Sequence, residues 1–152
     1  MEIIPNVHLI PGMRGANAYL LLGSTLTLVD SGMPGSEETI LGYIEGLDLN
    51  VGDLACIVIT HYHLDHVGSL AALKARTSAQ VFAHPGDAPF ISGEQSPPPA
   101  SSTLMRFLFW LATPLMLGTE PVPVDATVQD GDHLDTAGPL GGATVVHVPG
   151  HT

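Results

Sequence analysis

The sequence predicts an α/β protein built in layers, in which short strands alternate with helices. Short apolar runs rich in β-branched residues recur along the chain and are bounded by glycine and proline, which is typical of strands. Between these runs, apolar residues recur at helical spacing. With 45% hydrophobic and 12% charged residues, the chain can bury a core of its own. The β-α-β-α-β order favours a sheet with helices packed against it.

Three strands are expected before the first helix, at residues 7–10, 18–22 and 25–29. The helix follows a Pro-Gly pair, where Ser36 is a suitable N-cap, and we expect it to end near Gly46. Its expected buried face consists of apolar residues at helical spacing, namely Ile40, Leu41, Ile44 and Leu47.

The next apolar run, residues 56–60, predicts a strand, residues 65–74 predict a second helix, and residues 80–83 predict another strand. A histidine-rich stretch therefore lies on the loop between a strand and a helix. In sheets of this kind, ligands gather at the carboxyl ends of the strands. The sequence thus indicates where a functional site would be.

Residues 92–125 break this alternation and are interpreted as a proline-flanked, apolar insertion in a single domain. Its apolar run, residues 104–117, is too short to span a bilayer and contains Arg106. Core or interface packing is the favoured role for this run. The alternative is a substrate pocket formed with Phe107 and Trp110. A last strand is expected at residues 143–148.

The amino-acid composition indicates which classes of binding partner and which cellular compartment to expect. Fifteen acidic against four basic residues give a formal net charge of −11, which repels phosphate backbones, so no nucleic acid partner is expected. A small-molecule substrate is expected instead. The lone Cys56 sits in an apolar run, which indicates a buried thiol compatible with a reducing compartment. No signal-peptide pattern is present at the start, so the expected location is the cytoplasm, and the oligomeric state is left open.

The most informative segment is the H-x-H-x-D-H pattern of His61, His63, Asp65 and His66. Residues two apart on an extended strand end point to the same side, so His61 and His63 can bind one cation together. Asp65 and His66 follow where the next helix begins, so they are displaced and could bind a second cation. Imidazole suits zinc, iron or manganese, and a carboxylate adds negative charge.

This pattern, together with residues 28–32 before it and residues 149–152 after it, resembles the metallo-β-lactamase superfamily and its glyoxalase II-like members. The resemblance implies an αββα sandwich of which the N-terminal half to two-thirds is present. It also implies that His61, His63 and His151 bind a first metal and that Asp65 and His66 bind a second. Asp30 would orient these ligands.

The implied cofactor is zinc, two ions in the complete protein, with iron or manganese as alternatives. The implied activity is that of a metal-dependent hydrolase in which Asp65 orients a metal-bound hydroxide that attacks the substrate. The apolar insertion favours an ester, thioester or lactone. An iron-dependent sulfur dioxygenase of the same fold is the alternative enzyme.

Family members continue beyond this point into a second half that supplies a further Asp and His, whereas no Asp or His follows His151. We therefore expect residues 1–152 to form one incomplete domain, and an inactive truncated fragment is a third possibility. Two plainer roles stay open: Asp65 as a helix N-cap and Asp30 as a turn residue. For the remaining histidines structural or surface roles are expected, namely His8, His84, His133 and His147.

Overall fold

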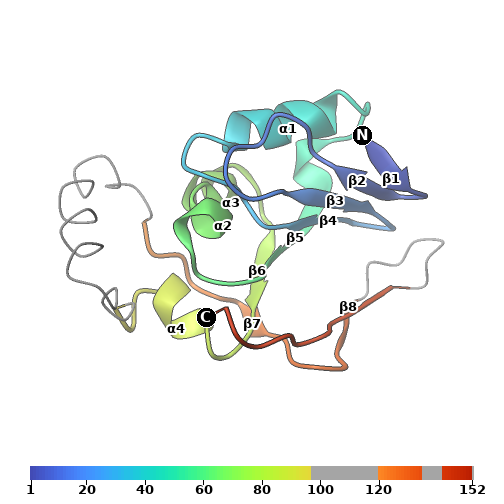
Figure 1. Ribbon diagram of the computed structural model, residues 1–152. Coiled ribbons are helices and arrows are strands. Elements are labelled where there is room, and N and C mark those ends of the chain that lie inside the picture. The colour runs from blue at the N-terminus through green and yellow to red at the C-terminus, as the bar shows by residue number, and fades with distance from the viewer. Residues whose placement is uncertain (97–119, 135–141, 152) are drawn as a thin grey trace.

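The computed structural model describes residues 1–96, 120–134 and 142–151, and its main feature is a seven-stranded sheet in the order β1-β2-β3-β4-β5-β6-β7 (Figure 1). The strands follow one another across the sheet in the order of the chain. Their bounds are β1 Glu2–Ile4, β2 Val7–Leu9, β3 Tyr19–Leu22, β4 Leu26–Val29, β5 Leu54–Ile59, β6 Gln80–Ala83 and β7 Ala126–Thr127. A separate antiparallel pair consists of β8 His133–Leu134 and β9 Ala143–Thr144.

The pairing between neighbouring strands changes at β4 from antiparallel to parallel. Strands β1 to β4 pair antiparallel, whereas β4 to β7 pair parallel. Parallel neighbours need crossover connections, which helices usually provide. The helical elements are α1 Glu37–Glu45, the 3₁₀ turn η1 Val51–Asp53, α2 Leu64–Val67, α3 Leu70–Arg76 and α4 Ala88–Ile91. The predicted α/β layering is confirmed.

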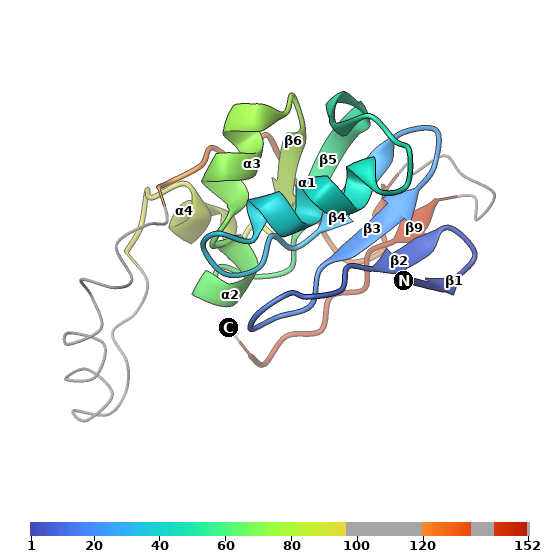
Figure 2. The same cartoon turned by 90° about the horizontal axis from the view of Figure 1, so that it is seen from above.

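Helices α1 and α3 cover one face of the sheet and lie side by side across it (Figure 2). In register across β3, β4, β5 and β6, that face presents apolar side chains that are fully buried, namely Leu20, Leu28, Ile57 and Val81. The helices contribute Ile40 and Ile44 from α1 and Leu70 and Leu73 from α3 to the same core. Burying these side chains is the main source of stability.

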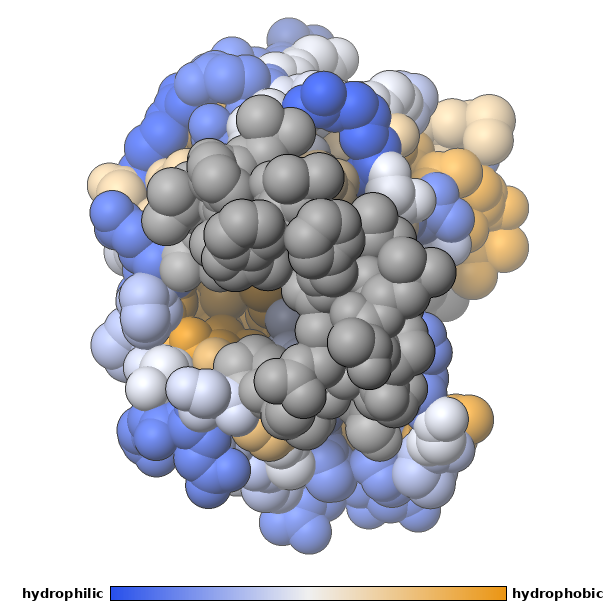
Figure 3. All heavy atoms as spheres, turned by 60° about the vertical axis from the view of Figure 1, so that its left-hand side comes forward, coloured by the Kyte–Doolittle hydropathy of each residue, from blue (hydrophilic) through white to orange (hydrophobic). Residues whose placement is uncertain are grey.

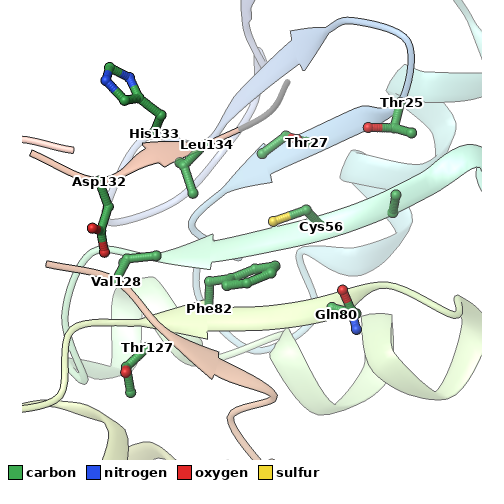
Figure 4. Close-up of a pocket in the computed structure, with 11 residues that line it drawn as sticks. Thr25, Thr27, Cys56, Gln80, Phe82, Thr127, Val128, Asp132, His133 and Leu134 are labelled. Atoms are coloured by element: carbon green, nitrogen blue, oxygen red, sulfur yellow. The ribbon is translucent and has the colours of Figure 1, made fainter. Parts of the chain in front are cut away.

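The opposite face of the sheet meets the β8–β9 pair. Figure 4 shows Thr27, Cys56 and Phe82, which come from β4, β5 and β6, on the side where Leu134 of β8 lies. A cavity of about 430 Å³ lies between these layers. Cys56 is half-buried, and burial raises the pKa of its thiol to about 12, although a hydrogen bond with Thr27 opposes the shift.

Three neighbouring parallel strands end at the same edge of the sheet, and a polar residue follows each of them. Asp30 follows β4, Thr60 follows β5 and His84 follows β6. The histidine-rich loop begins at this edge, directly after Thr60. The topology therefore gathers these side chains where α/β folds usually bind ligands.

The structure differs from the predicted elements in several places. Strand β1, the η1 turn and helix α4 were not predicted, and the strand expected at residues 143–148 is limited to β9. The helix expected at residues 65–74 is divided into α2 and α3. The division falls at Gly68, where the chain passes so close to Pro34 that an added Cβ would lie 2.4 Å from the Pro34 nitrogen.

Ser36 precedes α1 as expected, but its side chain makes no capping hydrogen bond. Its backbone N–H instead donates to Oγ of Ser69, at 2.8 Å, and Ser69 Oγ in turn donates to the backbone oxygen of Met33. The start of α1 is thus tied to the break between α2 and α3. This contact joins the loop between β4 and α1 to the residues between α2 and α3.

Part of the interpreted insertion is described. Val122 is buried, and its N–H donates to the backbone oxygen of Ile91. Asp125 is held by Lys74 and by the N–H of Val81, each at 2.7 Å, and these hydrogen bonds lower its pKa. The run at residues 104–117, with Phe107 and Trp110, lies outside the described residues.

In the described part of the chain, no helix reaches the length and apolarity that crossing a membrane requires.

The surface of the protein is mixed in hydropathy. Figure 3 shows mostly hydrophilic colours over the described surface on the side in view, with apolar colours gathered in a few patches. Among the described residues, the exposed large apolar side chains come from the first four residues and from the C-terminal segment, namely Met1, Ile3, Ile4, Val146 and Val148.

Candidate metal centre

Three histidines from two distant parts of the chain meet beyond the end of β5. His61 and His63 lie on the loop that leads into α2, and His151 comes from the C-terminal segment. One ring nitrogen from each lies within 4.8 Å of the other two. The ring of His151 is centred 4.9 Å from the ring of His61 and 4.9 Å from that of His63. The structure thus brings together the three side chains expected to bind the first metal.

The spacing of their nitrogens fits a metal ion. Tetrahedral zinc with Zn–N bonds of about 2.1 Å holds its ligand nitrogens about 3.4 Å apart. Nε2 of His61 and Nδ1 of His63 are 3.1 Å apart, close to that value. Three imidazoles also match the ligand preferences of zinc. The three-histidine cluster of His61, His63 and His151 is therefore a suitable cation site in its chemistry and its dimensions.

The two remaining residues of the motif lie next to this cluster. Nε2 of His66 is 3.8 Å from Oδ2 of Asp65, and the rings of His66 and His61 are centred 3.9 Å apart. Asp65 and His66 thus present one oxygen and one nitrogen to a common space beside the first cluster. The N-cap alternative for Asp65 is wrong, because His63 occupies the N-cap of α2 and Asp65 lies in its first turn.

Asp30 is hydrogen-bonded to His66 and to Thr60, the residue that precedes His61. It is 4% exposed, and its Oδ2 accepts a hydrogen bond from Nδ1 of His66 at 2.8 Å. Its Oδ1 accepts the backbone N–H of Thr60 at 2.9 Å. The backbone of Asp30 has φ 61°, a left-handed conformation that Asp tolerates better than most residues. Asp30 therefore ends β4 in a turn and also orients a motif histidine.

Sequence reasoning missed Thr60. Its hydroxyl donates to Oδ2 of Asp30 at 2.8 Å and lies 3.1 Å from Nδ1 of His61. With a proton on Nδ1, His61 donates to Thr60 and presents the lone pair of Nε2 to the cluster. Thr60 thus favours one tautomer of His61. It also holds the carboxylate of Asp30, which in turn favours one tautomer of His66. Its place directly before His61 was the only signal in the sequence.

The environment shifts the pKa values of the motif histidines in opposite directions. Burial, and then the neighbouring His66 and His63, lower the pKa of His61. Burial and His151 lower the pKa of His63 in the same way. For His66, burial acts downward, but the hydrogen bond to Asp30 and the charges of Asp30 and Asp65 raise its pKa overall. His61 and His63 are therefore neutral, as metal ligation requires, to lower pH than an isolated imidazole.

The centre opens onto a cavity of about 810 Å³. His61 and His151 lie in its wall beside aromatic and aliphatic side chains, including Tyr62, Phe90, Val146 and Val148. Phe107 and Trp110, the pocket residues considered from the sequence, lie outside the described residues. The described wall of the cavity is thus largely apolar next to the three-histidine cluster.

The other histidines are outside the cluster. His8 is buried and bonded to the hydroxyl of Tyr43, which fits the structural role expected for it. His133 lies 3.1 Å from the hydroxyl of Thr144 across the β8–β9 pair. His84 and His147 stack on each other in the wall of the large cavity, an arrangement that the sequence did not predict.

Comparison with known proteins gives the family. The profile of the metallo-beta-lactamase superfamily matches residues 11–152. The chain belongs to this superfamily. The αββα sandwich fold expected from the resemblance is supported by solved structures of metallo-beta-lactamases. One is the class B3 di-zinc metallo-beta-lactamase LRA-12 from an Alaskan soil metagenome, with TM-score 0.75, 26% identity and coverage of 97% of this chain and 51% of that one.

Two curated relatives are named as hydrolases. The probable metallo-hydrolase YflN of Bacillus subtilis is 27% identical over 135 residues, which are 84% of this chain and 49% of the relative. The hydroxyacylglutathione hydrolase of Albidiferax ferrireducens is 45% identical over 49 residues, 32% of this chain and 18% of the relative. The chain spans about half the length of YflN and of LRA-12 and less of the other relative.

Proposed function

We propose that this superfamily member is part of a metal-dependent hydrolase that cleaves an ester, thioester or lactone. The observation that carries the proposal is the convergence of His61, His63 and His151, with one nitrogen of each within 4.8 Å of the others. Packing alone does not require three imidazoles at one point, and a shared cation accounts for them.

The proposed cofactor is zinc, with two ions in the complete protein. His61, His63 and His151 would hold the first ion, and Asp65 and His66 would contribute to the second. The relative LRA-12 is described as a di-zinc enzyme, which supports this choice. When bound, such ions lower the pKa of coordinated water toward neutrality and polarise the substrate carbonyl.

The residues of the chain have separate roles in this proposal. Asp65 is the proposed catalytic carboxylate: its side chain is 40% exposed, so it can accept a hydrogen bond from the attacking water and orient it. Asp30, which is buried, keeps His66 in one tautomer and does not contact the substrate. The lowered pKa values of His61 and His63 keep their lone pairs free at neutral pH.

The substrate class is inferred from the cavity. Phe90, Val146 and Val148 give its wall an apolar character beside the histidines, which suits the acyl part of a small substrate. The similarity to a hydroxyacylglutathione hydrolase favours a thioester. A net charge of −11 disfavours polyanionic substrates such as nucleic acids.

The test uses the purified full-length protein that contains this chain. Its metal content is measured, and hydrolysis of a hydroxyacylglutathione thioester, an aliphatic lactone and a β-lactam is assayed without oxygen. We expect bound zinc, turnover of the thioester or lactone, and loss of both metal and turnover in His61→Ala. The matched control is His133→Ala, which removes an exposed histidine outside the cluster. Bound iron with oxygen consumption would contradict hydrolysis and favour the dioxygenase.

A further inference from the structure

We propose that the turn between β6 and α4, residues 84–87, is a positioning device that holds together the two chain segments that form the three-histidine cluster. The inference rests on the proposed metal site and adds residues that act on it indirectly. We call this segment the β6–α4 turn. One of its ends contacts the loop that carries His61 and His63, and the other contacts the segment that carries His151.

The first contact is made by Asp87. This residue is 7% exposed, and its Oδ1 accepts the backbone N–H of Tyr62 at 3.1 Å. Tyr62 lies between His61 and His63 in the sequence, so the position of its backbone helps to set the positions of both histidine side chains. The Tyr62 ring also packs on Phe90 of α4, with ring centres 4.7 Å apart. Asp87 and α4 therefore fix the histidine loop on its outer side.

The second contact is made by His84. Its ring stacks on that of His147 with centres 4.1 Å apart and an angle of 13° between the planes. His147 belongs to the same C-terminal segment as His151, and its N–H donates to Oδ1 of Asp130 at 3.0 Å. Within the described residues, no hydrogen bond from residues 148–151 reaches the sheet. The stack on His84 therefore holds this segment four residues before His151.

The turn between these contacts is internally bonded. The N–H groups of Asp87 and Ala88 donate to the backbone oxygen of His84, at 2.9 and 3.0 Å. The N–H of Gly86 donates to Nδ1 of His84 at 3.1 Å. Because Nδ1 accepts this bond, the proton of the neutral ring is on Nε2 and the ring plane is held. The two contacts are therefore linked by a short, braced segment.

The expected consequence is in metal affinity. His151 must meet two histidines from a distant part of the chain, and a ligand that is not held in place costs affinity when it is ordered. Changes to residues that support metal ligands weaken binding by about 10-fold to 100-fold. Since His84 acts on His151 through His147, we expect the lower end of that range.

The test measures zinc affinity of the full-length protein by competition with a chromophoric chelator. We expect His84→Ala to weaken zinc binding by about 10-fold. His84→Phe keeps a flat ring for the stack on His147 but loses the hydrogen bond from Gly86, so it should recover most but not all of the affinity. Asp87→Ala should weaken binding to a similar extent, whereas Asp87→Asn keeps the acceptor for Tyr62 and should not. His133→Ala is the matched control, with unchanged affinity expected.

A thermodynamic cycle with His151→Ala separates positioning from a general structural effect. If His84 acts through His151, the loss caused by His84→Ala disappears in the His151→Ala background. An equal loss in both backgrounds would overturn the proposal, as would wild-type affinity in both His84→Ala and Asp87→Ala. A wild-type protein that binds no zinc would overturn the proposed function as well. Far-UV circular dichroism identifies variants that fail to fold, and His84→Phe and Asp87→Asn then decide the question.

Discussion

Nδ1 of His66 donates a 2.8 Å hydrogen bond to Oδ2 of Asp30. A carboxylate accepts and does not donate, so the bond fixes the proton of His66 on Nδ1. Nε2 then carries the free lone pair, and it lies 3.8 Å from Oδ2 of Asp65. A buried residue at the end of β4 thus determines which nitrogen of His66 keeps its lone pair free, and in the proposed site that nitrogen faces the second cation.

Asp30→Asn is expected to weaken the proposed second metal position more than the first. An amide keeps the shape of the side chain, but its NH₂ group can donate to Nδ1 and favour the wrong tautomer of His66. Affinity for the second ion should fall by about 10-fold to 100-fold. Isothermal titration of the metal-free full-length protein with zinc measures both steps.

The matched control for this substitution is Asp53→Asn, because Asp53 is an exposed aspartate of the η1 turn. Its titration should equal that of the wild type. Unchanged binding of both ions by Asp30→Asn would contradict the role assigned to the carboxylate.

Gly68→Ala is expected to lower the free energy of unfolding by about 1 to 3 kcal/mol. The backbone conformation of Gly68 suits any residue, but an added Cβ would lie 2.4 Å from the nitrogen of Pro34 and 2.6 Å from the oxygen of Leu64. Gly42→Ala is the control, because no atom lies within 4 Å of its added Cβ and an alanine stabilises a helix by roughly 0.5 to 1 kcal/mol. Urea unfolding of both variants checks the opposite signs.

Acidification is expected to release the two proposed ions in a set order. Only neutral imidazole binds metal, so a raised pKa brings proton competition at higher pH and a lowered pKa delays it. The raised pKa of His66 predicts that the second ion is lost first as the pH falls. The lowered pKa values of His61 and His63 predict that the first ion persists to lower pH. Zinc content after dialysis at stepwise lower pH would show one ion leaving before the other, and loss of both at the same pH would contradict this order.

The thiol of Cys56 is expected to be unreactive in the folded protein. Burial raises its pKa to about 12, so almost no thiolate, the nucleophilic form, is present at pH 8. Labelling with iodoacetamide, followed by mass spectrometry, should be slow in buffer and rapid in concentrated urea. Fast labelling of the folded protein would show that the layer over β5 is open.

Much of the fold could be predicted because its signals are local. Strands β2 to β6 and helix α1 correspond to apolar runs and helical spacing in the sequence. Strand β1 could not be predicted, because all three of its residues are exposed and show no alternation. The break at Gly68 depends on the packing of Pro34, which is distant in the sequence, so no local pattern contained it.

For the candidate site, the i, i+2 spacing of His61 and His63 was sufficient to predict that their rings lie together. That His151 meets them depends on the path of the whole chain, and the sequence supplied it only through resemblance to the superfamily. Thr60 and the stack of His84 on His147 could not be predicted, since both depend on tertiary contacts. The ligand roles of the motif residues are predictions.

The central claim is tested most directly by a crystal structure of the full-length protein grown with zinc and measured at the zinc absorption edge. The account predicts an anomalous peak about 2.1 Å from Nε2 of His61, from Nδ1 of His63 and from a ring nitrogen of His151. A zinc-loaded crystal with no peak among these three rings, or with its zinc bound by other residues, would contradict it.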